Sequence, residues 1–338
     1  MESGKSALIF AGFTGIRARL PIVALLAVTL LASCTKSAPP ATPASATQQD
    51  GALISFQDDA GRNIELPHRP ERIVVLSPQL LNLLYDVGGT AIARATASGA
   101  KVPEAAAQLE SVGGMTTVNT EKLLALEPDL VIGSTVFHRD LAGLLDASRV
   151  PFALFDLGTY ADLKAKAALF GRLAGTEDRA AEALRQLDQA IKEFTGRVPA
   201  DRSPSFIMLN VTPNSLSIQR ADTVGLEAAA MLNMTNVAES LESLDNRPSA
   251  APFSLEKIVE LDPDYIFLLI HGARAEGESK IRSDLAAQPA WASLRAVREN
   301  RTYVLPSDLL LSNPGFRLNE SIEYLAKLVY PDVFGHDR

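Results

Sequence analysis

The sequence predicts an α/β fold in which two small lobes, each built on a parallel-type sheet, are joined by one long α-helix. Three observations carry this prediction. Short apolar or β-branched runs alternate with helical patterns along most of the chain. The longest unbroken helical pattern, residues 176–198, lies near the middle. A unit at residues 119–132 also recurs in outline at residues 254–267.

Length and composition are those of a globular protein with about two domains. The chain has 338 residues, of which 47% are hydrophobic and 21% are charged. Its formal net charge is −8, whereas nucleic-acid binding needs a dense basic face, so we expect no nucleic-acid partner. The only cysteine is Cys34, which excludes an internal disulfide and a Cys-x-x-Cys motif.

The N-terminus has the layout of a secretory signal. Basic residues precede an apolar stretch at 20–31, which is too short for a membrane-spanning helix of about 20 residues. The following Leu-Ala-Ser-Cys at 31–34 resembles a bacterial lipobox. We therefore expect a signal peptide at 1–33 and a lipid on Cys34. The alternative is an ordinary signal peptide with a cysteine there by chance.

Residues 34–52 predict a flexible tether, because they are mostly Ala, Pro, Thr, Ser and Gln and cannot bury a core. A lipid on Cys34 and a tether would hold the body outside the cytoplasm, in the cell envelope, close to a membrane but not in it.

The first α/β lobe is expected at residues 53–173. Segments 54–57 and 62–66 flank Asp-Asp-Ala-Gly, which indicates a hairpin. Three strand–helix pairs follow, which implies right-handed crossovers in a parallel sheet. The expected strands are 72–76, 130–133 and 152–155, and their helices begin near 80, 140 and 161.

The linking helix is expected at 174–199, with Thr176 as its N-cap and acidic residues in its first turn. The second lobe is expected at 200–338. There we predict strands at 206–209, 265–269 and 302–305, a helix after Asp222, and a final helix near 319–329.

The internal repeat relates the two lobes. Residues 119–132 read NTEKLLALEPDLVI and residues 254–267 read SLEKIVELDPDYIF. Each copy predicts an N-capped helix, a Pro-Asp turn and a strand.

At this point the chain resembles the helix-linked periplasmic substrate-binding proteins of ABC importers, which serve ferric siderophores, haem, cobalamin and related metal chelates. The resemblance covers roughly residues 54–334. Its matching stretches, besides the mid-chain helix, are 71–78 (ERIVVLSP), 119–133, 254–267 and 289–306 (PAWASLRAVRENRTYVLP). It implies a ligand cleft between the lobes and modest closure around the connecting helix. It also implies a monomeric binding protein, not an enzyme, whose partners are a permease dimer and its ATPase subunits.

Glu121 and Glu256 open the two copies of the repeat. The resemblance implies that each docks onto arginines of the permease, one Glu from each lobe. Two acidic groups on pseudo-equivalent surfaces suit a two-fold partner. The alternative is that each Glu only interacts with the helix dipole in a first helical turn.

Ligand-binding candidates lie in loops that follow strands, where open α/β sheets hold their ligands. The arginines suit carboxylate or catecholate groups of an anionic chelate. The candidates are Ser77, Gln79, Met115, Thr116, His138 and Tyr160 in the first lobe, and Arg220, His271, Arg274, Asp308 and Arg317 in the second. Trp291 is expected in the core.

Whether residues of the protein bind a metal directly is left open by the sequence. His138 and His271 are weak candidates, because two histidines are too few for a closed metal site. Either His, with Met115 or Tyr160, suits axial ligation of haem, and both together with Asp308 suit a bare metal ion. The resemblance implies no intrinsic cofactor. We expect a ferric siderophore-type chelate as ligand, then haem or a corrinoid, then a free metal ion.

Two rival classes remain. A secreted α/β hydrolase lacks support, because the sequence has no G-x-S-x-G, Walker loop, H-E-x-x-H, or G-x-G-x-x-G after a strand. Ser77 is a poor nucleophile, since Pro78 stands where an oxyanion N–H would be needed. The other rival is a chelate-holding surface lipoprotein without a transporter partner.

Overall fold

The computed structural model describes residues 53–335, apart from residues 98 and 246. The expected signal peptide, Cys34 and the expected tether lie outside these described residues. The described residues belong to one compact unit. None of their helices is both long and apolar enough to cross a membrane.

The first lobe is built on a six-stranded sheet. Its strands are β3 (Ile73–Val75), β4 (Ala93–Thr96), β5 (Glu110–Gly114), β6 (Thr117–Val118), β7 (Leu130–Ser134) and β8 (Phe152–Phe155). The order across the sheet is β6-β5-β4-β3-β7-β8, and only the β5–β6 pair is antiparallel. The predicted parallel-type sheet is therefore present, and it includes β4, β5 and β6, which the apolar pattern did not reveal.

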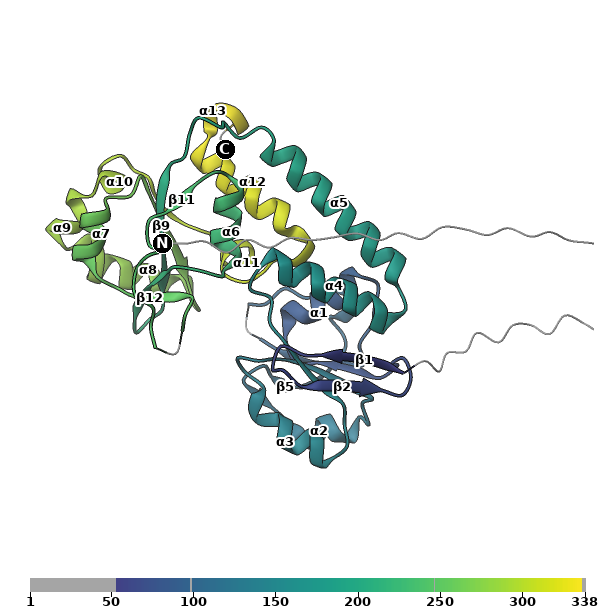
Figure 1. Cartoon of the computed structure of the whole chain (residues 1–338). Coiled ribbons are helices and arrows are strands. Elements are labelled where there is room, and N and C mark those ends of the chain that lie inside the picture. The colour runs from purple at the N-terminus through teal and green to yellow at the C-terminus, as the bar shows by residue number, and fades with distance from the viewer. Residues whose placement is uncertain (1–52, 98, 246, 336–338) are drawn as a thin grey trace, which may run out of the picture. The chain divides into compact units, whose positions relative to one another are not determined.

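In this lobe a helix follows each predicted strand along the chain (Figure 1). The predicted hairpin is also present, and it precedes the strands of the sheet in the sequence. The hairpin consists of β1 (Ile54–Gln57) and β2 (Asn63–Leu66), and the helical segments are α1 (Pro78–Asp86), η1 (Glu104–Ala106), α2 (Thr120–Ala125), η2 (Arg139–Leu141), α3 (Ala142–Ala147) and α4 (Tyr160–Ala174). Asp58 fixes the hairpin to the sheet, because its buried carboxylate accepts the backbone N–H of Leu154 at 3.0 Å.

The long helix α5 (Glu177–Thr195) follows α4 after Gly175, whose φ of 69° turns the chain sharply. Thr176 occupies the N-cap position, but its side chain makes no capping bond, and its buried hydroxyl has no hydrogen-bond partner. The predicted N-cap position and helix start are therefore confirmed, but Thr176 does not contribute the side-chain hydrogen bond that usually stabilises an N-cap. In Figure 1, α5 runs beside α4, and it also packs against the helix Leu318–Val329 of the second lobe.

The second lobe is built on another six-stranded sheet. Its strands are β9 (Ser205–Val211), β10 (Leu216–Gln219), β11 (Thr235–Asn236), β12 (Ala250–Pro252), β13 (Tyr265–Ile270) and β14 (Thr302–Val304). The main order is β12-β10-β9-β13-β14, and β11 pairs with the start of β9. This sheet is mixed, since β10 runs antiparallel to both neighbours.

Ten helical segments of various lengths cover the second sheet among the described residues. They are α6 (Val224–Met231), α7 (Leu255–Leu261), α8 (Arg274–Ile281), η3 (Arg282–Ala286), α9 (Pro289–Ser293), α10 (Arg295–Arg298), α11 (Ser307–Leu310), η4 (Gly315–Arg317), α12 (Leu318–Val329) and α13 (Pro331–Phe334). Trp291 on α9 is buried, as predicted.

One apolar core is shared by the two lobes. Alternate residues of β3 and β13, such as Ile73 and Phe267, belong to one cluster that also includes Leu163 of α4, Leu187 of α5 and Leu325 of α12. The opposite faces of the two sheets belong to two separate clusters. Because close-packed side chains resist deformation, this shared core opposes wide hinge motion between the lobes.

The two copies of the repeat have the same structure. Asn119 and Ser254 cap α2 and α7 through their side chains, as predicted. The Pro-Asp turns then contact the start of a neighbouring strand. Asp129 accepts the backbone N–H of Arg72 at 2.8 Å, just before β3, and Asp264 accepts that of Ser205 at 2.9 Å, the first residue of β9.

Candidate functional site

Each sheet has one position where the strand order changes direction. In the first sheet it lies between β3 and β7, and in the second between β9 and β13. Ligands of open α/β sheets bind beyond the carboxyl ends of strands at such positions. The segments at the carboxyl ends of these four strands, residues 76–79, 134–138, 212–215 and 271–274, are called the switch-point loops below, although they include the last residue of β7 and the first residues of α1 and α8.

The carboxyl ends of the two sheets meet at one ion pair. Lys101 Nζ lies 2.8 Å from Asp308 Oδ2, and Arg317 lies 3.7 Å from the same carboxylate. Lys101 follows β4, whereas Asp308 follows β14. The hydrogen bond from Lys101 lowers the pKa of Asp308. This contact shows that loops from the carboxyl ends of both sheets face each other.

Ser77, at the end of the loop after β3, and Gln79, in the first turn of α1, lie side by side. The Ser77 hydroxyl donates to Gln79 Oε1 at 2.9 Å, and Ser77 is buried. This hydroxyl has no histidine partner, so the arrangement lacks the base that a serine nucleophile requires. The partly exposed Gln79 amide remains suited to hydrogen bonding with a ligand.

His138 is buried, and backbone groups occupy both of its ring nitrogens. Ser134 N–H donates to Nδ1 at 2.9 Å, which fixes the proton on Nε2, and Nε2 donates to the carbonyl of Met115 at 2.8 Å. Burial lowers the pKa of His138, so the ring is neutral at pH 7. With no free lone pair, His138 is not available as a metal ligand in this structure.

His138 instead connects two loops, and the neighbouring side chains of Val136 and Phe137 are exposed. It ties the loop after β7 to the β5–β6 turn, which carries Met115 and the exposed Thr116. Val136 and Phe137 on the same loop are 73% and 50% exposed. The sequence analysis selected His138 and missed Phe137. An apolar Val-Phe pair inside a short polar loop was the available signal.

His271 begins the loop after β13 and has a defined tautomer. Its Nε2 lies 3.2 Å from Asn210 Oδ1, which also accepts from Gln219 Nε2 at 2.9 Å. An amide oxygen only accepts, so Nε2 of His271 carries the proton and Nδ1 has a free lone pair. Gln219 is itself fixed by the hydroxyl of Thr223 at 2.7 Å. The sequence analysis did not identify this supporting role of Gln219.

Burial, and then the positive charge of Arg247, lower the pKa of His271, so that its ring is neutral at pH 7. Of the two histidine candidates, only His271 has a free lone pair. Within residues 53–335 as described, no group of three His, Cys, Asp or Glu side chains is placed to hold a bare metal ion.

Tyr160 is a structural residue in this arrangement. Tyr160 is only 7% exposed and lies in the shared core. Its hydroxyl donates to Asp188 of α5 at 2.8 Å. Burial and this carboxylate raise the pKa of Tyr160. Its backbone N–H, the first of α4, donates to the carboxylate of Glu227 in the second lobe. Tyr160 therefore connects α4 to α5 and to α6.

Two predicted arginines are bound to their own surroundings. Arg220 donates to three backbone carbonyls in residues 239–248, at 2.8 to 3.1 Å, and so holds that loop in place. Arg274 pairs with Glu278 one turn along α8 at 2.8 Å. Arg317 pairs with Glu320 at 2.7 Å but also reaches Asp308 at the interlobe contact. Arg317 is therefore the arginine best placed to meet a ligand.

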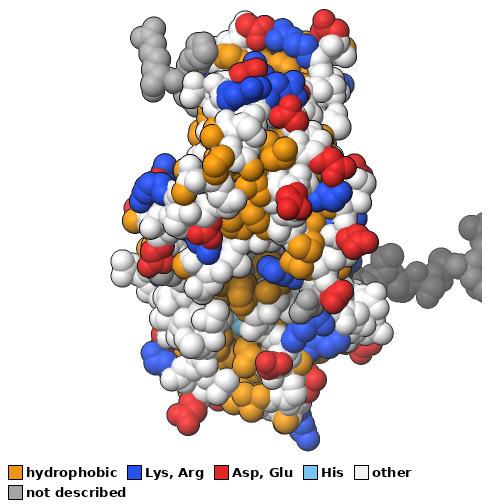
Figure 2. All heavy atoms as spheres, turned by 90° about the vertical axis from the view of Figure 1, so that its left-hand side faces the viewer, with side chains coloured by type: hydrophobic (Ala, Val, Ile, Leu, Met, Phe, Trp, Pro, Cys, Tyr) orange, Lys and Arg blue, Asp and Glu red, His pale blue; other side chains and the backbone are white. Residues whose placement is uncertain are grey.

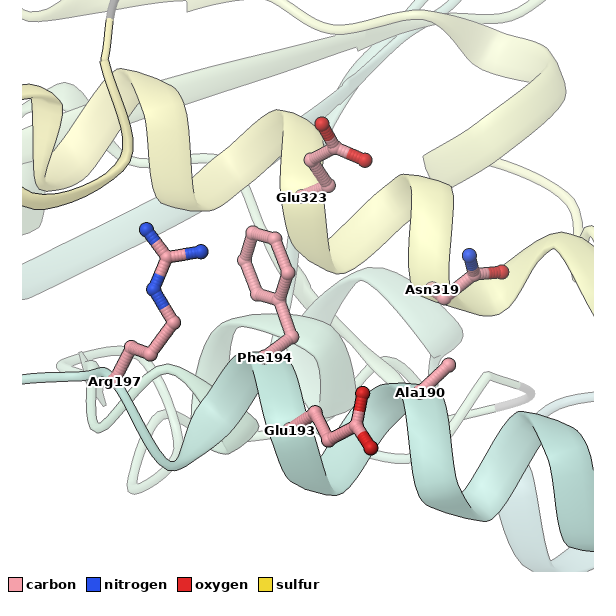
Figure 3. A pocket seen from close by; sticks show the side chains of 6 residues that line it. All are labelled: Ala190, Glu193, Phe194, Arg197, Asn319 and Glu323. Atoms are coloured by element: carbon pink, nitrogen blue, oxygen red, sulfur yellow. The ribbon is translucent and has the colours of Figure 1, made fainter.

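A surface groove of about 350 Å³ lies elsewhere, between α5 and α12. Figure 3 shows Phe194 of α5 pointing across it toward α12, with Arg197 beside that ring. Arg197 also stacks on Phe334, at 4.6 Å from the ring centroid. None of the predicted site residues lines this groove. Figure 2 shows another face of the molecule, where hydrophobic side chains gather along the middle and charged side chains lie on both sides.

Glu121 and Glu256 occupy matching positions. Each is exposed in the first turn of its helix, and neither makes an ion pair or hydrogen bond with any described residue. The adjacent lysines are paired elsewhere, Lys122 with Glu110 at 3.7 Å and Lys257 with Glu260 at 2.7 Å. Each carboxylate is therefore free to meet a partner.

These features are those of a ligand-binding protein with two lobes and one connecting helix. The chain belongs to the periplasmic binding protein family, whose model matches residues 73–309. This confirms the family predicted from the sequence.

Individual relatives agree with the family and the fold. An uncharacterized ABC transporter substrate-binding lipoprotein of Bacillus subtilis is 25% identical over 94% of this chain and 98% of its own length. The Fe(3+)-citrate-binding protein of the same organism is 23% identical over 91% of this chain and 95% of its own. The crystal structure of Staphylococcus aureus SirA complexed with staphyloferrin B has a TM-score of 0.68 at 20% identity, covering 82% of this chain and 98% of that one. The predicted two-lobe fold with a connecting helix is thus confirmed.

Proposed function

We propose that the protein is the extracytoplasmic receptor of an ABC importer and that it binds one ferric siderophore-type chelate between its lobes. The observation that carries this proposal is the ion pair of Lys101 and Asp308, because it joins segments that follow the carboxyl ends of strands in both sheets, the edges at which open α/β sheets bind ligands. The names of the ferric-citrate-binding relative and of the staphyloferrin B complex support an iron chelate.

The chemistry of the loops suits an anionic chelate. Gln79 and Thr116 offer polar groups on the first lobe, and Arg317 with Lys101 offers positive charge at the junction. Guanidinium and ammonium groups recognise carboxylate and catecholate oxygens. We keep Gln79, Thr116 and Arg317 from the sequence prediction as ligand contacts and add Lys101. Ser77, Arg220, Arg274 and Tyr160 are committed to internal contacts and act as structural residues in this proposal.

A haem or corrinoid ligand is the second candidate, and one observation favours it. The free Nδ1 lone pair of His271, oriented by Asn210 and Gln219, has the second-shell support typical of an axial ligand to a metal already held by a macrocycle. Such a ligand brings its own metal and four donors, so one protein ligand is sufficient.

The ligand test is a calorimetric titration of the purified protein, supported by absorbance. The panel contains ferric catecholate, hydroxamate and citrate chelates, haem, cobalamin and divalent metal ions. One chelate should bind at one-to-one stoichiometry with micromolar or tighter affinity, and Arg317→Ala should weaken it. A Soret shift that is lost in His271→Ala would select haem instead. Absence of binding across the panel would overturn the receptor proposal.

We further propose that Glu121 and Glu256 dock onto the permease. Both carboxylates are exposed, unpaired with any described residue, and related by the internal repeat. Exposed ion pairs contribute only about 0–1 kcal/mol each, but they set register and association rate. The double variant Glu121→Arg/Glu256→Arg should abolish uptake of the ligand in cells and leave its affinity unchanged. Equal charge reversal at Glu65 and Glu242, one exposed Glu in each lobe outside the two repeat copies, is the matched control. Normal uptake by the double variant would favour the lipoprotein without a transporter.

The expected lipid anchor stays part of the proposal. The relative named a substrate-binding lipoprotein supports it, whereas Cys34 lies outside the described residues. Cys34→Ala should abolish incorporation of labelled fatty acid and release the protein from the membrane fraction. Labelling that persists in this variant would contradict a lipid on Cys34.

A further inference from the structure

The loop after β7 exposes two apolar side chains that the fold does not need. Val136 is 73% exposed and Phe137 is 50% exposed. Phe137 is the only aromatic side chain in the described part of the chain that counts as exposed. A single exposed apolar residue is ordinary, so exposure alone carries no argument. The position and rigidity of this pair are what require explanation.

The backbone on both sides of the pair is held in place. His138 N–H donates to the Ser134 carbonyl at 3.0 Å, and Val136 N–H donates to the Ser134 hydroxyl at 3.2 Å. Arg139 donates to the carbonyl of Thr135 at 3.0 Å, and the Thr135 hydroxyl donates to Asp156. The loop therefore presents its apolar tip in one conformation, which reduces the entropy cost of binding a ligand.

A second connection brings another loop alongside. The buried ring of His138 accepts from Ser134 and donates to the Met115 carbonyl at 2.8 Å. The β5–β6 turn, with the half-exposed side chain of Met115, is thereby fixed to the same loop. Met, Val and Phe side chains are thus gathered at the carboxyl end of the first sheet. They belong to the switch-point side of that sheet, where the proposed ligand lies.

We propose that Phe137, supported by Val136, is the apolar wall of the ligand site and that it selects a chelate with an aromatic face. This inference rests on the proposed function and narrows it. A flat π-system stacks on a phenyl ring in an offset or edge-to-face arrangement. Catecholate chelates and macrocycles share this chemistry, whereas citrate has no aromatic ring.

The test compares Phe137→Ala and Phe137→Leu with Leu144→Ala, a control at an apolar residue of α3 that is 40% exposed. Calorimetry is run on each purified variant with a ferric catecholate, haem and ferric citrate. Phe137→Ala should weaken binding of the catecholate or of haem by about tenfold, equivalent to 1.4 kcal/mol. Phe137→Leu should fall between it and the wild type, and Leu144→Ala should match the wild type.

The outcomes separate this inference from the proposed function. Tight binding of ferric citrate by the wild type, with no effect of Phe137→Ala, leaves the receptor proposal standing and overturns the aromatic selection. Lost uptake with unchanged affinity in Phe137→Ala also overturns it, because the tip would then contact the permease. Binding of no chelate at all defeats both. The two aromatic ligands distinguish a catecholate from a macrocycle.

Discussion

Replacing Tyr160 by Phe tests whether this tyrosine stabilises the fold or binds the ligand. The hydroxyl of Tyr160 donates to Asp188 at 2.8 Å, and the ring is buried in the core shared by α4, α5 and α12. Tyr160→Phe removes only the hydroxyl and keeps the packing. If Tyr160 acts as this structure indicates, the variant should lose stability and keep its ligand affinity.

The size of the loss follows from the two partners. A hydrogen bond to a charged group contributes roughly 1.5–3 kcal/mol to stability. The Asp188 side chain is 55% exposed, so water can solvate the carboxylate that the hydroxyl leaves behind. We therefore expect a decrease of about 1 kcal/mol in the free energy of unfolding. For a protein of this size, that corresponds to a decrease of about 2–4 °C in Tm.

Urea unfolding followed by far-UV circular dichroism measures the change, and calorimetry measures ligand affinity on the same samples. Tyr303→Phe is the control, because Tyr303 is half-buried and its hydroxyl has no hydrogen-bond partner among the described residues. That control should unfold like the wild type. A Tyr160→Phe variant with normal stability and tenfold weaker ligand binding would show instead that the Tyr160 hydroxyl contacts the ligand.

Four further predictions use other contacts. Burial lowers the pKa of His138 and of His271 below the ordinary value of 6.5. In acid, the unfolded chain therefore binds more protons than the folded protein. The free energy of unfolding should accordingly have its full value above pH 6.5 and decrease below it, which urea unfolding at a series of pH values measures. His138→Ala should cost about 2–4 kcal/mol by removing a buried ring and leaving two partly buried backbone groups unpaired, which urea unfolding measures, and it should flatten that pH dependence. Lys101→Ala should change stability by less than about 1 kcal/mol, because the Lys101 side chain is 75% exposed, and yet weaken binding of an anionic chelate in a salt-dependent way by calorimetry. Arg220→Ala should increase hydrogen exchange in residues 239–248 without changing ligand affinity, and a lost affinity would place Arg220 in the ligand site.

Apolar runs were sufficient to predict most of the strands that form the two cores. Phe152–Phe155 and Tyr265–Ile270 lie within one residue of the predicted ranges, because a strand buried on both faces must be apolar throughout. β4 reads Ala-Arg-Ala-Thr and β10 reads Leu-Ser-Ile-Gln, so their short polar sequences resemble loops. Their strand conformation depends on neighbours that a local pattern does not contain.

The candidate site, like the strands, could be predicted from the sequence only in part. The order of strands and loops correctly predicted most of the loops at the carboxyl ends of the parallel strands. It was wrong for Arg220, which follows β10, because β10 runs antiparallel to β9 and so ends at the opposite edge of the sheet. The sequence could not predict which side chains remain free there, because the partners come from distant segments. Tyr160 binds Asp188, and Arg220 binds carbonyls up to 28 residues away. His138 turned inward while its neighbour Phe137 turned outward.

Hydrogen exchange on the purified protein, with and without the best-binding chelate, tests the central claim most directly. Ligand binding should slow exchange in switch-point loops of both lobes, residues 134–138 and 271–274, and in residues 99–103 and 307–310 around the Lys101–Asp308 contact. Exchange in the groove between α5 and α12 should stay unchanged. Protection confined to that groove, or to the loops of one lobe, would contradict a ligand held between the lobes.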